Sequence, residues 1–308
     1  MNIKVKDDFS FKGWNKCIYL TNDKIEVVVT TEVGPRIIRF GFTGGQNLFG
    51  EIKEQLGKSG GDEWRIYGGH RLWHAPEANP RTYYPDNEPV EYEIKRNNIR
   101  LIQNVESTTG IQKEMEIRLG ADSSEVVVLH RINNKTLWDI ELAPWAISVM
   151  NLGGRAIIPQ EPFQSWDERL TPVRPLVLWG YTDMSDPRWI WGKKYIQLRQ
   201  DPDLKTRQKI GVLNTLGWVA YYLKGELFVK RYDYDKNAQY PDFGVNTEVY
   251  TDSDILEVET LGKLEKIPPG GFVEHIERWF LFKVELDETE ESIDENVLPL
   301  IKSCYPAN

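Results

Sequence analysis

The chain contains little cysteine and no apolar run long enough to span a bilayer. Its 308 residues include only two cysteines, Cys17 and Cys304, whereas small disulfide-stabilised domains are much richer in cysteine. No run of about 18 apolar residues occurs, so no transmembrane helix is expected. The segment Met1–Asp8 contains no apolar stretch of the kind that a signal peptide needs. We therefore expect reduced thiols, a cytoplasmic location and no membrane partner.

Clustered positive charge and the common nucleotide motifs are missing as well. The chain has 38 Lys and Arg against 47 Asp and Glu, a net charge of −9, and its basic residues are scattered among acids. Binding to a phosphate backbone needs clustered Lys and Arg, so no nucleic-acid partner is expected. There is no Gly-x-Ser-x-Gly elbow, no P-loop and no Gly-x-Gly-x-x-Gly after a strand. We expect no cofactor.

Aromatic residues, in contrast, are abundant. The chain contains 11 Trp, 14 Tyr and 11 Phe, and 40% of its residues are hydrophobic. Such a composition supports a large folded core. Aromatic rings also bury the flat faces of sugars while polar neighbours bind the hydroxyl groups. The tryptophans therefore indicate either a carbohydrate site or simply a large β core.

Alternation of apolar and polar residues with a period of two dominates the sequence and predicts an all-β fold. Short Gly, Asn or Asp punctuation separates the segments, which is typical of antiparallel strands. With no linker and no internal repeat, we expect one domain over residues 1–308. The predicted strands are Lys24–Thr30, Arg36–Phe42, Val90–Lys95, Ile99–Val105, Ile111–Leu119, Glu125–Ile132, Asp139–Val149, Tyr195–Gln200, Lys209–Asn214, Trp218–Lys224, Glu226–Tyr232, Thr247–Tyr250, Asp254–Gly262 and Glu274–Val284.

Two long regions interrupt the strands, residues 43–89 and 155–194, both rich in proline and aromatic residues. Long loops in a compact domain are usually functional, and these two are expected to wall a pocket. The only predicted helix is Glu288–Lys302, which opens with acidic residues suited to a helix N-terminus but contains Pro299.

The first candidate site is the segment Gly68–Glu77, which contains His70, Arg71, Trp73 and His74. In a sugar site, Arg71 and the histidines would donate hydrogen bonds and Trp73 would stack on the ring, with Glu77 as a further binder. A metal site would need His70 and His74 on one helical face near Glu77. The flanking glycines and Pro76 argue against that helix, so no metal is expected. A turn with satisfied polar side chains is the structural alternative.

Two further candidates lie near the C-terminus. Alternation places Glu257 and Glu259 on the same face of one strand. One of them could act as a general base, and the other, Glu257, as its hydrogen-bonding neighbour or as a substrate-binding residue. The preceding stretch supplies the potential hydroxyl binders Asp242, Asn246 and Glu248. A solvated polar strand is the alternative interpretation of the paired glutamates.

Several motifs carry a resemblance to a known family. Leu256–Thr260 (Leu-Glu-Val-Glu-Thr) is followed by Ile267–Gly270 (Ile-Pro-Pro-Gly), and Val33–Ile37 and Gly69–Leu72 provide a Gly-x-Arg-Ile-like turn and an Arg-bearing loop. In order and motif the chain resembles the galactose mutarotase-like superfamily, which includes aldose 1-epimerases. It looks more closely like an uncharacterised bacterial branch of that superfamily. The resemblance covers most of the chain loosely and implies a large antiparallel β-supersandwich, which would end here in the short helix.

The resemblance also implies roles for individual residues. In aldose epimerases the Glu of the Glu-Thr pair removes the proton of the anomeric hydroxyl, and this Glu corresponds to Glu259. Arg71 matches a substrate-binding arginine of the family.

The family's acid is a His in a short Asn-His-x-Tyr segment, after a strand that follows an Asn-x-Thr turn. Here the matching turn is Asn133–Thr136, and the stretch Leu142–Ala146 after it contains no His. A second family His, in a His-Gly-x-x motif, is not identifiable either. Because mutarotation needs an acid on the ring oxygen, His70 or His74 is expected to supply it from another loop.

Three functions remain open at this point. The first is an aldose 1-epimerase-like isomerase with Glu259 as base, His70 or His74 as acid, and a small-molecule sugar as ligand. The second is a carbohydrate-binding protein without catalysis, which the missing His favours. The third is a glycoside hydrolase or polysaccharide lyase, which needs two carboxylates flanking the scissile bond. We expect a monomer or a homodimer.

Overall fold

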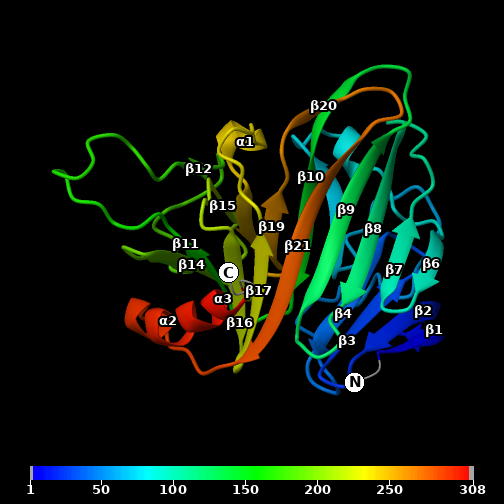
Figure 1. Cartoon of the computed structure of the whole chain (residues 1–308), viewed down its shortest axis with the longest axis horizontal. Helices are drawn as coiled ribbons and strands as arrows, with labels where there is room; N and C mark the ends of the chain where they lie inside the picture. The colour runs from blue at the N-terminus through cyan, green and yellow to red at the C-terminus, as the bar shows by residue number, and fades with distance from the viewer. Residues whose placement is uncertain (1–2, 305–308) are drawn as a thin grey trace.

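The strands form two large antiparallel sheets that pack against one another (Figure 1). The computed structural model describes residues 3–304. Within these residues, sheet A has 11 strands. In spatial order they are β1 (Lys4–Phe11), β2 (Trp14–Thr21), β3 (Ile25–Thr30), β4 (Arg36–Phe42), β5 (His70–Ala75), β10 (Ile140–Met150), β19 (Leu256–Leu261), β18 (Thr247–Thr251), β15 (Gln208–Val212) and β12 (Leu176–Leu178), with β20 (Glu265–Ile267) paired to β10.

Sheet B has 10 strands within the same described part of the chain. Their spatial order is β13 (Trp189–Trp191), β14 (Tyr195–Arg199), β11 (Arg155–Pro159), β16 (Trp218–Leu223), β17 (Glu226–Tyr232), β21 (Phe272–Lys283), β9 (Val126–Asn134), β8 (Ile111–Leu119), β7 (Asn98–Ile102) and β6 (Glu91–Lys95).

The main core lies between the two sheets. Strand β9 shows how the sequence builds it, because buried and half-buried residues alternate along its whole length, as expected for a strand with one face in the core. At the centre, Phe40 and Phe49 from the sheet A side meet Phe228 and Trp279 from sheet B, with ring centroids 5.5–6.1 Å apart. Contacts of this kind hold the two sheets in a fixed position relative to one another.

A short helical segment covers part of the outer face of sheet B, over β11, β14, β16 and β17. The predicted helix is two helices, α2 (Glu290–Asn296) and α3 (Leu298–Ser303). Pro299 occupies the first turn of α3, where its missing N–H needs no partner. Apolar residues of this segment, such as Ile293 and Ile301, pack against Trp218 and its neighbours in a second core cluster. Within residues 3–304 no helix has the length and apolar character needed to cross a bilayer.

The predicted all-β antiparallel supersandwich with a short C-terminal helix is confirmed. Most predicted strands are present with ends shifted by one to three residues, and Arg36–Phe42, Ile111–Leu119 and Glu226–Tyr232 have the predicted bounds. The sequence did not predict β1, β2, β5, β11, β12, β13 and β20. Of these, β5 is the important omission, because it lies in the region expected to be a loop.

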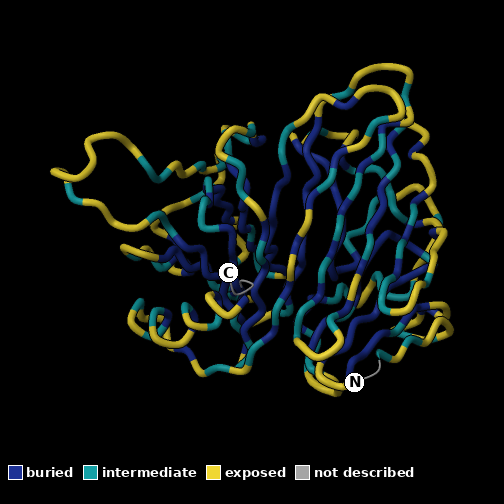
Figure 2. The backbone as a smooth tube through the Cα atoms, in the orientation of Figure 1, coloured by how far each residue is buried: buried dark blue, intermediate teal, exposed yellow. Residues whose placement is uncertain are grey.

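The second expected loop region contains β11, β12 and β13 but also a long projecting segment. Residues 160–175 extend away from the sheets on the left of Figure 1 and are exposed over most of their length (Figure 2). The other short elements are a 3₁₀ turn at Arg81–Tyr83 and the four-residue α1 (Pro241–Gly244), in which Asp242 and Phe243 have positive φ.

Candidate functional site

Strand β5 divides its side chains between the two faces of sheet A, because successive residues of a strand point to opposite sides. Arg71 and Trp73 lie on the outer face, where both line a cavity. His70 and His74 lie on the inner face, and their rings are buried among residues of sheet B. One strand therefore supplies both a surface site and the interior.

Neighbouring strands continue the outer face in register. On β10, Ile147 lies opposite Arg71 on one side and Glu259 of β19 on the other. Glu259 in turn lies opposite Glu248 of β18. Paired residues of antiparallel strands project from the same face, so Arg71, Ile147, Glu259 and Glu248 form one row across the sheet. Glu257 projects from the same face two residues before Glu259.

Above this row lies a cavity of about 450 Å³. Four tryptophans line it together with tyrosines and charged side chains, and we call it the tryptophan cavity. Its lining residues are Trp64, Ile66, Arg71, Trp73, Glu77, Tyr83, Trp145, Ile147, Trp179, Tyr181, Arg207, Lys209, Tyr250, Ile255 and Glu257. The two regions expected to wall a pocket do so, since residues 64–83 and 179–181 come from them.

Arg71 is clamped at one side of the tryptophan cavity. Its Nη2 donates to Oε1 of Glu257 at 3.0 Å, and its guanidinium lies over the rings of Trp73 and Trp64, at 4.7 and 5.8 Å from their centroids. Arg71 is only 3% exposed, yet its Nε and Nη1 have no hydrogen-bond partner among the described residues. Buried donors normally have partners, so the N–H groups on these two nitrogens are suited to a ligand. Burial raises the pKa of Glu257, and Arg71 opposes that shift.

Lys209 of β15 forms the other side. Its ammonium lies between Trp145 and Trp179, 4.7 Å from each ring centroid. It is 2.7 Å from Oε2 of Glu248 and 3.1 Å from Oε2 of Glu259. Burial alone would lower the pKa of Lys209, but the two carboxylates hold it well above the ordinary value. Lys209 is therefore a cation at neutral pH.

Glu259 lies directly beneath the tryptophan cavity. It is 0% exposed and does not line the cavity itself. Its Oε2 accepts from Nε1 of Trp145 at 2.8 Å as well as from Lys209. Its Oε1 has no hydrogen-bond partner in the part of the chain that the structure describes. The carboxylate is thus held on one oxygen and free on the other.

A third carboxyl group joins Glu248 and Glu259. Asp242, in the α1 turn with φ of 50°, interacts with Glu248. Burial raises the pKa of Asp242, and burial together with Glu259 and Asp242 raises the pKa of Glu248 well above the ordinary value. Three carboxyl groups thus surround one ammonium. Like charges at close range oppose one another's ionisation, which adds to the effect of burial on the pKa of Glu248.

The predicted acids His70 and His74 do not reach the tryptophan cavity, because their side chains project from the inner face of β5. Burial lowers the pKa of His70 well below its ordinary value and that of His74 to about 3. Both rings are therefore neutral and remote from Glu259. This geometry does not support the role expected for them in proton transfer with Glu259. The alternative metal site with Glu77 is excluded for the same reason, since Glu77 lies on the cavity side.

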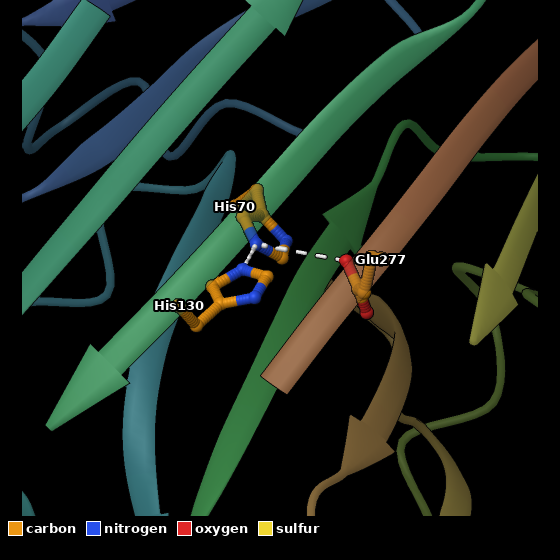
Figure 3. A group of neighbouring side chains, drawn as sticks. All are labelled: His70, His130 and Glu277. Carbon is orange, nitrogen blue, oxygen red and sulfur yellow. Dashed lines mark hydrogen bonds and ion pairs between the residues drawn. The ribbon is translucent and has the colours of Figure 1, made fainter. Parts of the chain in front are cut away.

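His70 belongs instead to a closed network inside the sandwich (Figure 3). Its Nε2 lies 2.7 Å from Nε2 of His130 and 3.8 Å from Oε2 of Glu277, while its Nδ1 lies 2.8 Å from the hydroxyl of Ser148. Nδ1 of His130 donates to the carbonyl oxygen of His275 at 3.1 Å. These contacts fix the tautomers, so that Nε2–H of His70 donates to Nε2 of His130.

His70, His130 and Glu277 are the kind of residues that could hold a metal, and their ligand atoms lie within 4.8 Å of one another. Lys230 already supplies the positive charge, because its Nζ lies 2.9 Å from Oε1 of Glu277. Thr260 and Trp279 donate to the same carboxylate. Since the two Nε2 atoms bond to each other, we assign this cluster to the stability of the fold.

Of the other predicted site residues, Arg71, Trp73, Glu77 and Glu257 line the tryptophan cavity. Glu77 lies at its edge and accepts a hydrogen bond from Tyr83.

Asp242 and Asn246 do not line the cavity. Asp242 interacts with Glu248, and Glu248 in turn lies beside Lys209, which lines the cavity. Asn246 is fully buried and holds the turn at Asn214, accepting from the backbone N–H at 2.7 Å and donating to the carbonyl at 3.0 Å. A structural role accounts for both ends of its amide.

Sequence reasoning missed Lys209, Trp145, Trp179 and Tyr181. Lys209 carries no motif, and only its strand was predicted. Trp145 lies in the stretch Leu142–Ala146, where the family resemblance led us to look for a His. This stretch therefore does contribute a side chain to the site, but the group is the indole N–H of Trp145 and not an imidazole. Burial raises the pKa of Tyr181 to about 12, so it remains a phenol that can donate.

No protein-family model and no curated protein matches this sequence. Solved structures do resemble it in fold. A proposed aldose 1-epimerase from Klebsiella pneumoniae superposes with a TM-score of 0.60 at 12% identity, covering 91% of this chain and 83% of that one. A galactose mutarotase-like protein from Lactobacillus casei gives a TM-score of 0.56 at 10% identity, covering 86% and 100%.

A TPR-domain containing protein from Parabacteroides distasonis gives a TM-score of 0.59 at 15% identity, and the match covers 88% of this chain. The chain spans about half of that protein's length, 48%. These comparisons confirm the resemblance at the level of the fold, which is that of the galactose mutarotase-like proteins. Identities this low say nothing about the reaction.

Proposed function

We propose that the tryptophan cavity binds a sugar ring and that the protein interconverts its anomers. The observation that supports this most directly is the free Oε1 of Glu259 beside the ammonium of Lys209, under a wall of four tryptophans. A base and a proton-bearing cation at one end of an aromatic cavity are the two chemical groups that mutarotation needs. The fold shared with the Klebsiella and Lactobacillus proteins agrees with this assignment.

In this proposal Oε1 of Glu259 takes the proton of the anomeric hydroxyl. Lys209 gives a proton to the ring oxygen while the bond between that oxygen and the anomeric carbon breaks, which leaves an open-chain aldehyde. Rotation of the aldehyde and closure in the reverse sense return both protons and give the other anomer. Glu248 and Glu259 together hold the pKa of Lys209 above its ordinary value, so Lys209 carries the proton that it gives.

Binding requires stacking and hydrogen-bond donors. Trp73 and its neighbours offer flat apolar surfaces, and the free N–H groups of Arg71 are donors for sugar hydroxyls. Arg71 therefore orients the ring while Glu259 and Lys209 act on it.

A second candidate, sugar binding without catalysis, is favoured by one observation. Glu259 is 0% exposed behind Trp145 and Lys209, so a sugar in the cavity reaches it only if Lys209 shifts.

The test is anomeric exchange measured by NMR with selective inversion of one anomer, over a panel of neutral and phosphorylated aldoses. We expect the wild type to accelerate exchange for at least one sugar, and Glu259→Gln to lose the acceleration while still broadening the sugar signals. Glu265→Gln, an exposed change on β20, is the matched control and should behave as wild type. Sugar binding with no acceleration by the wild type would establish the second candidate.

A further inference from the structure

A second cavity of about 420 Å³ adjoins the tryptophan cavity on the same face of sheet A. We call it the neighbouring cavity. Its lining residues are Phe11, Lys12, Arg39, Asn47, Phe49, Gly50, Glu51, Ile52, Lys53, Val149, Asn151, Leu152, Asp254 and Ile255. No step of the proposed reaction uses any of them.

The two cavities are continuous along the sheet. Ile255 lines both of them. On β10, Ile147 lines the tryptophan cavity and Val149, two residues further, lines the neighbouring one. Val149 is paired with Glu257, the partner of Arg71. Two residues of a strand span about 7 Å, so the floors of the two cavities lie within the length of a ligand made of two linked rings.

The neighbouring cavity has the polar character of a sugar subsite. Lys53 and Asp254 are exposed at its edge. Lys12 is paired with Glu51 at 3.2 Å, with half of the lysine side chain still exposed. Phe11 adds a half-buried aromatic surface. Hydroxyl groups of a sugar can form hydrogen bonds with groups of both signs of charge, so this lining suits a polar ring.

We propose that the neighbouring cavity is a second sugar subsite, so that the ligand of this protein is an oligosaccharide of at least two linked residues. One sugar unit occupies the tryptophan cavity, and the next unit lies in the neighbouring cavity, beyond Ile255. This inference rests on the proposed function, because it assumes that the tryptophan cavity holds a sugar ring.

The test compares monosaccharides with their disaccharides. Glucose, galactose and mannose, and reducing disaccharides built from them, are titrated into the full chain while tryptophan fluorescence is followed. We expect at least one disaccharide to bind about tenfold or more tightly than its parent monosaccharide, a gain of about 1.4 kcal/mol.

Two variants locate that gain. Leu152 is 43% exposed in the wall of the neighbouring cavity, and Leu152→Trp fills it. The double variant Lys53→Ala with Asp254→Ala removes its exposed polar groups. Both should lower disaccharide affinity to that of the monosaccharide and leave monosaccharide affinity unchanged. Leu137→Trp, at the exposed turn between β9 and β10, is the matched control.

Equal affinities of the wild type for disaccharide and monosaccharide would overturn the inference, as would a disaccharide advantage that survives in both variants. Either result leaves the proposed function standing. Failure of every sugar to bind the wild type would instead refute the proposed function itself.

Discussion

The buried pair of Lys230 and Glu277 provides the sharpest test of the interior network. Both side chains are 0% exposed, and Nζ of Lys230 lies 2.9 Å from Oε1 of Glu277 and 3.0 Å from the carbonyl oxygen of Val258. Burial would raise the pKa of Glu277, but Lys230 and the nearby histidines hold it below the ordinary value. The carboxylate is thus ionised in the middle of the sandwich because a cation lies beside it.

Replacing Lys230 with Met keeps the aliphatic stem and removes the charge. Breaking a buried pair from one side costs about 3–5 kcal/mol, because it leaves the other charge uncompensated. Most domains are stable by only about 5–15 kcal/mol, so Lys230→Met should shift the urea unfolding midpoint strongly at pH 7.

The double variant Lys230→Met with Glu277→Gln removes both charges. Gln can still accept the hydrogen bond from Trp279 through its amide oxygen and can present its NH2 group to the hydroxyl of Thr260. The double variant should therefore recover about half or more of the stability lost in the single one. Urea unfolding followed by circular dichroism, with unchanged m-values, measures both losses. The single variant Glu277→Gln completes the comparison. If the losses of the two single variants simply add in the double variant, the pair is not coupled and the reasoning is refuted.

Two further predictions concern the interior and the entry to β5. Burial lowers the pKa of His130 to about 4 and of His275 to about 3, so these groups bind protons in the unfolded chain before they do so in the folded one. The free energy of unfolding is therefore unaffected by these histidines above pH 6.5. As the pH falls from 6.5 toward 4, it decreases by about 1.4 kcal/mol per pH unit for each histidine. A urea midpoint that is flat between pH 7 and 5 would contradict this. Gly69 has φ of +69°, and a Cβ there would lie 2.3 Å from the carbonyl oxygen of Ile37. Gly69→Ala should cost more than Gly153→Ala, where φ is +85° but the space is open and only the backbone cost of about 1–2 kcal/mol applies; thermal unfolding compares the two, and equal losses would argue against the steric term.

The parts of the fold that the sequence predicts well are those whose strands have one face in the core. Ile111–Leu119 shows this pattern, and its bounds agree with the structure. His70–Ala75 does not, because both faces of β5 are buried and both carry polar residues. Flanking glycines and Pro76 also suggested a turn. A local pattern cannot reveal a strand whose polar residues are satisfied by distant partners.

The candidate site was predictable to the extent that motifs mark it. Glu259 and Arg71 were found through the resemblance, and the pairing of Glu257 with Glu259 through alternation. Lys209 could not be found in this way, since its role depends on β15 lying two strands away from β19 in sheet A. His70 was misplaced for a related reason. The sequence does not predict a strand at residues 70–75, and without that strand nothing indicates that adjacent residues lie on opposite faces of the sheet.

The alternation along β5 has a consequence for how this protein can evolve. Odd-numbered residues of the strand face the cavity and even-numbered residues face the core, so a slip of one position would exchange the two sets and damage both at once. Changes in the loops that carry Trp64, Trp179 and Tyr181 can therefore alter the walls of the cavity without altering the core between the two sheets. The floor of the cavity is constrained by two unrelated demands, and we expect variation among relatives to concentrate in the walls.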